Sequence, residues 1–501
     1  EYKAGGPALP PLTAGEYTFT YPASGKEALA SQTGTKEGLK AYHYMEATFT
    51  AEEGQGWNDL PSLSFETKVA IVKLTLKNEA FKGKEVTGVT LRSAEDAYAA
   101  TSVFTGSDAD GSIVAYFAVE PGSLTGCVIG ATCEDDYYEA SLSNNTLSAG
   151  RLYRVNKTMA KAHIDLSPVV AGVNRTANSY IVSKAGDYKF RATHKGNSTS
   201  STVGTINSAV VLWESFGTST APSEGDLVKN VDYSDGYITF TATAAEGNAV
   251  IAAKDASDKI LWSWHIWLTD KPAEHEYAHS AGTMMDRNLG ATSATPGDVG
   301  ALGLLYQWGR KDPFLGSSAI SGYNVARSTK TWPGRVESSA ETGTIAYAVT
   351  HPTTFISNAD EYSNKDWYYT GDKTTDNTRW TESENVKSVY DPCPAGWRVP
   401  DGGTDGIWNT AGFDDPTFDG TNKGKTFSNN GIEIWYPAAG YLAYDNVLSN
   451  AGTSLYCWTA TPWPESANAI NLYFKSSSGS QNLATNHGMR VIGCSVRCCK
   501  E

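Results

Sequence analysis

Residues 259–269 have the sequence Lys-Ile-Leu-Trp-Ser-Trp-His-Ile-Trp-Leu-Thr, and this stretch indicates the fold class. Every second residue in it is large and apolar. These residues are Ile260, Trp262, Trp264, Ile266 and Leu268. Apolar residues at a period of two are typical of a β-strand with one face in a hydrophobic core. His265 falls on the opposite face, where we expect it to be a structural histidine.

Similar alternation occurs elsewhere in the first half of the chain. The strands expected first are residues 69–77, 112–119 and 150–159. The strands expected just before the tryptophan-rich stretch are residues 186–192, 208–213 and 236–242. We therefore expect a mainly β, multidomain protein that begins with two antiparallel β-sandwiches, over residues 1–165 and 166–272.

The pattern changes after residue 272. Asp298 is a good helix N-cap, and apolar residues follow it at helical spacing, which predicts an amphipathic helix. These residues are Ala301, Leu304, Leu305 and Trp308. A second short helix is expected over residues 404–411, whereas residues 316–389 are polar and lack a clear period. Because short strands return after residue 430, residues 273–501 are expected to form an α+β domain.

Composition narrows the classes of partner. The chain has 40 Lys and Arg against 55 Asp and Glu, for a formal net charge of -15. Such a surface repels nucleic-acid phosphates and anionic lipid headgroups, so neither is an expected partner. No apolar run approaches the roughly 18 residues of a transmembrane helix. The seven cysteines include no Cys-x-x-Cys pair, and five of them lie from Cys393 onward, which suits one or two disulfides in an oxidising compartment.

The first two domains resemble fimbrillins. Residues 65–74 (Phe-Glu-Thr-Lys-Val-Ala-Ile-Val-Lys-Leu) and 150–159 (Gly-Arg-Leu-Tyr-Arg-Val-Asn-Lys-Thr-Met) look like two landmarks of fimbrillin N-terminal domains. Residues 177–182, 247–255 and 260–270 are similar to the second domain of the same proteins. Fimbrillins of this kind are the subunits of type V pili in Bacteroidetes.

The last third resembles the Fibrobacter succinogenes major paralogous domain, a C-type-lectin-like module. Its matching motifs are residues 285–291 (Met-Asp-Arg-Asn-Leu-Gly-Ala), 305–314 (Leu-Tyr-Gln-Trp-Gly-Arg-Lys-Asp-Pro-Phe), 391–400 (Asp-Pro-Cys-Pro-Ala-Gly-Trp-Arg-Val-Pro) and 496–498 (Val-Arg-Cys). Together the resemblances imply two transthyretin-like or Ig-like sandwiches followed by a C-type-lectin-like domain over residues 273–501.

The resemblance implies a non-enzymatic adhesin at the cell surface, in a pilus. Such pilins are exported as outer-membrane lipoprotein precursors and assemble by donor-strand exchange, in which an open sandwich accepts a strand of the next subunit. The expected partners are other pilin subunits and an unidentified host glycan, matrix or surface protein. The sequence ends at Lys500 and Glu501, directly after the last lectin-like motif, which favours a tip subunit that accepts a strand without donating one.

The resemblance also suggests how the cysteines are used. Cys393 is expected to pair with Cys498, tying the Asp-Pro-Cys turn to the final strand. Cys457 would then pair with Cys494, and Cys127 with Cys133 across a hairpin, leaving Cys499 unpaired.

Two other functions remain open. Formylglycine-generating enzymes share the lectin-like fold, but they need a reactive cysteine pair, for which Cys498 and Cys499 are the candidates. A glycan-binding surface lipoprotein outside any pilus is the second alternative. No cofactor or metal is expected, because the histidines lack metal-binding spacing and residues 273–501 contain neither Glu-Pro-Asn nor Gln-Pro-Asp.

Aromatic residues in the polar stretch 316–389 are the candidate ligand-binding residues. They are Trp332, Trp367, Tyr368, Tyr369 and Trp380. Aromatic rings can pack on the apolar C–H faces of sugars, while nearby hydroxyl and amide groups bind sugar oxygens. The alternative is that these rings pack the long loops onto the domain.

Overall fold

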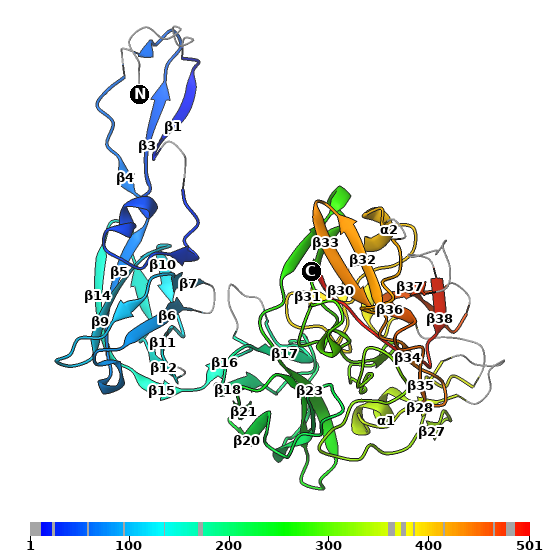
Figure 1. The fold of residues 1–501 in the computed structure, drawn as a ribbon. Coiled ribbons are helices and arrows are strands. Elements are labelled where there is room, and N and C mark those ends of the chain that lie inside the picture. The colour runs from blue at the N-terminus through cyan, green and yellow to red at the C-terminus, as the bar shows by residue number, and fades with distance from the viewer. Residues whose placement is uncertain are drawn as a thin grey trace. The chain divides into compact units, whose positions relative to one another are not determined.

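The computed structural model describes residues 12–22, 26–57, 60–93, 96–134, 136–168, 174–358, 366–371, 377–383, 386–413, 416–463, 466–476 and 486–501. They are mainly β-strands, as expected (Figure 1). The chain forms two compact units: unit 1 comprises residues 1–163 and 169–173, and unit 2 comprises residues 164–168 and 174–501. The division after His163 lies close to the first expected boundary, whereas the second and third expected domains both lie in unit 2.

Unit 1 is a β-sandwich with an added strand pair. One sheet contains, in order, β15 (Ala160–Ala162), β12 (Asp136–Ser141), β11 (Val128–Cys133), β6 (Glu85–Arg92), β7 (Ala97–Ala100) and β2 (Ser31–Gln32), with β8 (Phe104–Thr105) also on β6. The other contains β14 (Leu152–Thr158), β5 (Ala70–Lys77) and β9 (Ser112–Val119). The short strands β10 (Gly122–Leu124) and β13 (Asn145–Leu147) form a separate pair.

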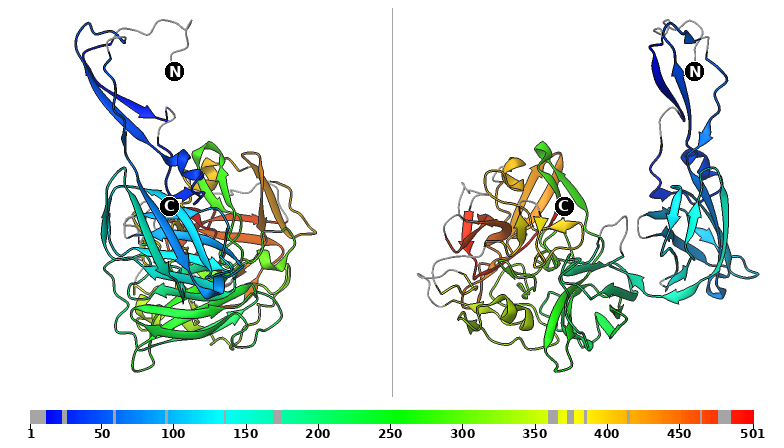
Figure 2. Two further views of the ribbon diagram at one scale, coloured as in Figure 1. Left: turned by 90° about the vertical axis from the view of Figure 1, so that its left-hand side faces the viewer. Right: turned by 180° about the vertical axis from the view of Figure 1, so that it is seen from behind.

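The remaining strands of unit 1 are β1 (Gly15–Tyr21), β3 (Met45–Ala51) and β4 (Glu66–Thr67). The β1–β3 pair extends beyond the sandwich (Figures 1 and 2).

The core of unit 1 confirms the predicted alternation in residues 69–77. Ala70, Val72, Leu74 and Leu76 are buried, and the residues between them are partly exposed. One detail differs from the expected antiparallel sandwich: β14 pairs with β5 in parallel, in the register Leu152 to Ile71. The sandwich is therefore mixed, and β14 lies at the edge of its three-stranded sheet.

Unit 2 begins with a second sandwich. Its first sheet contains β16 (Ile164–Asp165), β18 (Gly186–Arg191), β21 (Tyr237–Ala242) and β20 (Val228–Ser234). Its second sheet contains β17 (Ser179–Val182), β23 (Ile260–Leu268), β22 (Gly247–Lys254) and β19 (Ser208–Ser215). Here too the pairing is mixed, because β17 is parallel to β23.

Strand β23 is buried on both faces, although its sequence predicts only one buried face. Trp262, Trp264, Ile266 and Leu268 face the core between the two sheets, as expected. On the opposite face, Ser263, His265 and Trp267 are also buried, and Trp267 belongs to a core that extends to Cys494 and Cys498. The second sheet is therefore covered by the C-terminal part of unit 2.

That C-terminal part consists of short strands and loops. The first four-stranded sheet contains, in order, β24 (Glu274–Tyr277), β25 (Gly282–Met285), β40 (Cys499–Lys500) and β31 (Trp397–Arg398), and the second contains β26 (Tyr306–Gln307), β39 (Gly493–Cys494), β34 (Tyr441–Leu442) and β35 (Leu448–Ser449). A three-stranded sheet contains β36 (Ser454–Pro462), β37 (Asn468–Lys475) and β38 (Asn486–Met489). The two-stranded sheets are β32 (Gly424–Asn429) with β33 (Ile432–Pro437), β27 (Val336–Glu337) with β28 (Ile356–Ser357), and β29 (Thr381–Ser383) with β30 (Val386–Lys387). The α-helices are α1 (Ile345–Thr350) and α2 (Ile407–Thr410).

The prediction of a helix after Asp298 is wrong beyond the first turn. Asp298 does cap a turn, because its side chain accepts a hydrogen bond from the Gly300 N–H, but this 3-10 turn covers only residues 299–301. Gly303 and Gly309 then have φ values of +75° and +83°, which a right-handed helix excludes. The apolar residues of this segment are buried as expected, but in extended and turn conformations. The second expected helix is present as α2, with Ile407 and Trp408 buried.

Limited proteolysis of the full chain should cut first between the two units. Each unit has its own core, whereas residue 272 lies within a unit whose core includes residues from both sides of it. N-terminal sequencing should therefore find an early, stable fragment that starts between residues 164 and 178. An early fragment that starts near residue 272 would contradict the shared core.

Candidate functional site

The five aromatic residues expected to line a binding surface have different environments. Trp367 and Trp380 are buried, with 1% and 0% of their surface exposed. Their indole N–H groups donate to the backbone oxygens of Trp308 (2.8 Å) and Arg310 (3.1 Å). The expectation that these two rings lie at the surface is therefore wrong: they pack the loops onto the core.

The other three aromatic residues are accessible to different degrees. Tyr368 is half-buried, and its ring contacts the edge of Trp367. Tyr369 is 41% exposed. Trp332 is half-buried in a different place, where it lines a separate cleft. The structure thus does not bring the five residues into one surface.

We call this hollow the Trp332 cleft. It has a volume of about 720 Å³ and lies in unit 2. Most of its lining comes from residues 323–332, and the remainder from Phe314, Leu315, Ser318, Ser219, Leu442 and Asn446. Tyr323 is 76% exposed at the cleft.

The cleft is built on the edge of the second sandwich. The Thr329 N–H donates to the Glu214 carbonyl at 3.0 Å, and the Glu214 N–H donates to the Thr329 hydroxyl at 3.1 Å. The Ser215 hydroxyl donates to the Arg327 carbonyl at 2.6 Å, while the Arg327 N–H donates to the Thr218 carbonyl at 2.8 Å. These bonds hold the backbone of residues 327–329 alongside the end of β19.

Buried Glu214 strengthens this edge. Its carboxylate accepts hydrogen bonds from three backbone N–H groups, those of Gly225 (2.7 Å), Leu227 (2.9 Å) and Val228 (2.7 Å). Hydrogen bonds to a charged acceptor are roughly twice as strong as neutral ones, so this carboxylate keeps the strand end in place. It is directed at the sandwich loop and not at the cleft.

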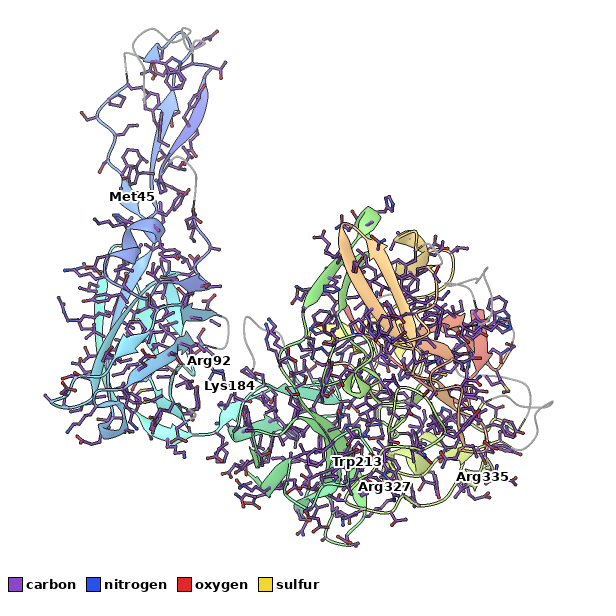
Figure 3. All side chains as sticks on the ribbon, in the orientation of Figure 1. Met45, Arg92, Lys184, Trp213, Arg327 and Arg335 are labelled. Carbon is purple, nitrogen blue, oxygen red and sulfur yellow. A yellow bond between two sulfur atoms is a disulfide. The ribbon has the colours of Figure 1, made fainter. Side chains whose placement is uncertain are left out.

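Aromatic packing supports the cleft from within. The Trp332 ring lies 5.3 Å from that of buried Trp213 and 5.9 Å from that of Phe314, between ring centroids. The Trp332 indole N–H donates to the Ser328 hydroxyl at 3.0 Å, and that hydroxyl donates to the Lys330 carbonyl at 2.7 Å. Figure 3 labels Trp213 and Arg327, which mark this region of unit 2. The indole orientation is therefore set by the protein itself.

A further part of the lining comes from the turn after β34. Asn446 adopts a left-handed conformation with φ of +65°, and the Ala443 N–H donates to the Val447 carbonyl at 2.9 Å to close the turn. Tyr323 and Asn324 were not among the candidate residues derived from sequence. The sequence signal is the same as for the chosen candidates, because aromatic Tyr323 lies beside short polar residues such as Asn324 in the stretch 316–389.

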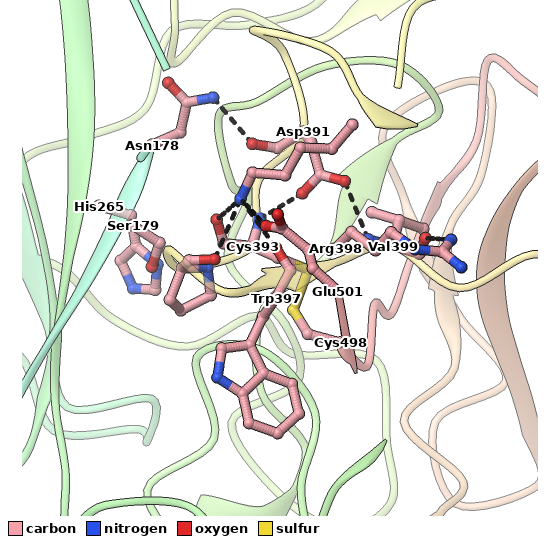
Figure 4. The surroundings of a disulfide bond; sticks show 12 residues. Asn178, Ser179, His265, Asp391, Cys393, Trp397, Arg398, Val399, Cys498 and Glu501 are labelled. Carbon is pink, nitrogen blue, oxygen red and sulfur yellow. Dashed lines mark hydrogen bonds and ion pairs between the residues drawn. A yellow bond between two sulfur atoms is a disulfide. The ribbon is translucent and has the colours of Figure 1, made fainter. Parts of the chain in front are cut away.

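The Cys393–Cys498 disulfide forms as expected and closes a sequence separation of 105 residues. Asp391 organises the turn around it, accepting hydrogen bonds from the N–H groups of Cys393 (2.8 Å) and Val399 (2.9 Å), as Figure 4 shows. Burial raises the pKa of Asp391 to about 6, although nearby Lys387 and the two backbone donors favour its charged form. The turn therefore has a structural role, because each of these hydrogen bonds holds the backbone in place.

The two other expected disulfides are not formed, and Cys499 is unpaired as expected. Cys127 directly precedes β11 and Cys133 ends it, so the two are about 20 Å apart at the rise of a strand, whereas a disulfide needs Cα atoms within about 7 Å. Cys457 lies opposite Ser495 in a parallel bridge, so the side chain of Cys494 points to the other side. Accordingly, Cys457 and Cys494 belong to different hydrophobic clusters.

Thiol chemistry is suppressed by burial in unit 2. Cys499 is 3% exposed, and burial raises the pKa of its thiol to about 12; the Cys457 pKa is raised to about 12 for the same reason. In the described part of the chain, no group of three or more His, Cys, Asp or Glu is placed to hold a metal ion. No helix among these residues is long and apolar enough to cross a membrane.

Comparisons with known proteins give weak likenesses. No family model matches the chain, and no curated protein matches it. A candidate cell adhesion protein of known structure from Bacteroides ovatus is 17% identical with a TM-score of 0.19, over 32% of this chain and 64% of that one. One from Bacteroides fragilis is 14% identical with a TM-score of 0.19, over 30% of this chain and 64% of that one.

The adhesin InvE of Yersinia pseudotuberculosis is 11% identical, with a TM-score of 0.14, over 61% of this chain and 78% of that one. The alignments with the two Bacteroides proteins span less than two thirds of their lengths. TM-scores this low do not define a shared fold.

Replacing the buried tryptophans should destabilise the protein. Trp367→Ala and Trp380→Ala each remove a fully buried ring and its indole hydrogen bond, so each should lower the free energy of unfolding by about 3–5 kcal/mol. Tyr369→Ala should change it by less than about 0.5 kcal/mol, because Tyr369 is exposed. Urea unfolding of the full chain measures all three, and equal effects would contradict the assignment of core and surface.

Proposed function

We propose that this protein is a non-enzymatic cell-surface adhesin that binds a glycan in the Trp332 cleft. The observation that carries the proposal is the composition of the cleft. Its aromatic residues Phe314, Tyr323 and Trp332 lie among hydroxyl and amide side chains from one short segment and its neighbours. Apolar ring surface beside convergent polar groups suits a sugar, which has apolar C–H faces and a rim of hydroxyl groups.

The rigidity of the cleft supports the same function. Its long segment is held by hydrogen bonds to β19, and its floor by the packing of Trp332 on Trp213. A binding surface that is already ordered loses less conformational entropy when it takes up a ligand, which favours affinity.

The state of the cysteines argues against the formylglycine-generating alternative. An enzyme of that kind needs an exposed thiolate, which requires a depressed pKa. Here Cys498 is in a disulfide, and Cys499 is buried with a raised pKa. These features support a binding function over thiol chemistry.

Tyr323→Ala tests the adhesive cleft. The ring is exposed at the cleft and makes little internal packing, so its loss should weaken binding to a glycan array roughly five- to tenfold without changing the melting temperature. Tyr369→Ala is the matched control, since it removes an exposed tyrosine outside the cleft. Matrix proteins printed on the same array test the alternative that the partner is a protein. Unchanged glycan binding by Tyr323→Ala would refute the proposal.

The adhesin is further proposed to be a pilus subunit that accepts a donor strand at β14. This strand lies at the edge of its sheet, and its solvent side is exposed from Leu152 to Thr158. Its odd-numbered residues bond to β5: the Ile71 N–H donates to the Arg151 carbonyl at 2.9 Å, and the Met159 N–H donates to the Lys77 carbonyl at 2.9 Å. The N–H and C=O groups between them point to the open edge, which an added strand can pair with.

Strand β40 is not free to act as a donor strand. Strand β40 lies between β25 and β31, where Cys499 is paired with both Met284 and Arg398. Residues 499–500 are therefore committed to the C-terminal sheet of unit 2.

A proline at the edge tests strand acceptance. Asn156→Pro removes an N–H that points away from β5, and edge strands tolerate proline, so the fold should survive. The probe is a peptide that copies the C-terminal strand of a pilin isolated from fimbriae of the same cells. It should raise the melting temperature of the unmodified protein but not of Asn156→Pro. No shift with the unmodified protein, and absence of the protein from purified fimbriae, would favour a surface protein outside the pilus.

A further inference from the structure

The charge of the Trp332 cleft is opposite to that of the chain. The chain has a formal net charge of -15. Among the described residues that line the cleft, Arg327 and Lys330 are basic and none is Asp or Glu. A local reversal of sign in a strongly acidic chain favours the binding of an anion at that place.

Both cations are available to a ligand. Arg327 and Lys330 are exposed, and neither side chain has an ion pair, hydrogen bond or ring contact with a residue that the structure describes. The nearby carboxylate of Glu214 does not neutralise them, because its oxygens accept the backbone N–H groups of the sandwich loop. Because these charged side chains have no partner within the described protein, a ligand's oxygens need to displace only water to bind them.

Their positions are nevertheless defined. The backbone of Arg327 is held at both its N–H and its C=O, by the Thr218 carbonyl and the Ser215 hydroxyl. The Lys330 carbonyl is held by the Ser328 hydroxyl, which also accepts the Trp332 indole N–H. The two cations are therefore fixed at their backbones beside the aromatic floor of the cleft, so one ligand can contact both a ring and a positive charge.

We infer that the ligand of the Trp332 cleft is an acidic glycan, one whose sugar units carry a carboxylate or a sulfate ester. This inference rests on the proposed function and names its ligand class. The guanidinium of Arg327 offers a planar fork of donors that matches a carboxylate or sulfate, and Lys330 adds a point charge. Tyr323 and Trp332 contact the sugar ring itself, while Asn324 and the hydroxyl side chains reach its neutral oxygens.

The test uses the full chain and three immobilised polysaccharides of related backbone. They are hyaluronan, which carries carboxylates only, chondroitin 4-sulfate, which carries both groups, and carboxyl-reduced, desulfated chondroitin, which is neutral. The unmodified protein should bind at least one acidic polymer at least tenfold more tightly than the neutral one. Preference for hyaluronan identifies the carboxylate, and preference for chondroitin 4-sulfate alone identifies the sulfate.

The double variant Arg327→Gln/Lys330→Gln should lose that preference, and its affinity should become nearly independent of salt. Arg335→Gln is the matched control. Arg335, labelled in Figure 3, is exposed and close in sequence but is not among the residues that line the cleft, so its replacement should leave the preference intact. Thermal melting should be unchanged for all variants.

The outcomes separate the two proposals. Equal binding of acidic and neutral polymers, with loss of both in Tyr323→Ala, would overturn the acidic ligand and keep the adhesive cleft. Acidic preference that survives the double variant would overturn the assignment to Arg327 and Lys330. Binding that is unaffected by Tyr323→Ala and by the double variant would overturn the adhesive cleft as well.

Discussion

The burial of the sheet β17–β23–β22–β19 on both faces is the constraint on which unit 2 depends. Its outer face carries polar side chains, and burying them is costly unless each finds a partner. The Lys311 ammonium meets this need by donating to Ser263 Oγ (2.7 Å) and to Asp312 Oδ1 (2.6 Å). Burial lowers the pKa of Lys311, and the ion pair with Asp312 acts in the opposite direction. Trp267 adds an indole bond to the Ala291 carbonyl.

These partners come from the segments that resemble the lectin-like motifs. Residues 285–291 supply the Ala291 carbonyl and also that of Gly290, which accepts from Asn248. Residues 305–314 supply Lys311 and Asp312, and the backbone of Asp391 accepts from Asn178 at 2.8 Å. The motifs therefore act in this chain as a joint between the sandwich and the C-terminal part. The joint thereby holds the C-terminal part, which supplies every lining residue of the Trp332 cleft except Ser219, against the sandwich.

The sequence was sufficient where a single periodicity decides the structure. It predicted the strands at residues 69–77 and 260–268 and the core face of each. It failed after Asp298, where helical spacing of apolar residues was overridden by two glycines with positive φ. It also failed for Trp367 and Trp380, since an aromatic residue in a polar stretch looks the same whether it lines a surface or anchors a loop. The Cys393–Cys498 bridge was predictable from its motif, but no local pattern reveals that Cys457 and Cys494 face opposite sides. Tyr323 and Arg327 become candidates only once β19 and the turn at Asn446 enclose them.

His265 makes the stability of this joint depend on pH. Asn248 donates to Gly290, so its oxygen faces His265 Nε2 (2.8 Å), and the imidazole accepts from the Ser179 hydroxyl at Nδ1 (3.0 Å). The ring is thus held neutral, and burial lowers its pKa to about 3, against about 6.5 for an unfolded chain. A depressed histidine pKa contributes stability that is complete above about pH 6.5 and declines as the pH falls toward 3. Opening the joint therefore takes up a proton in mildly acidic surroundings, so acidity weakens the attachment of the C-terminal part to the sandwich.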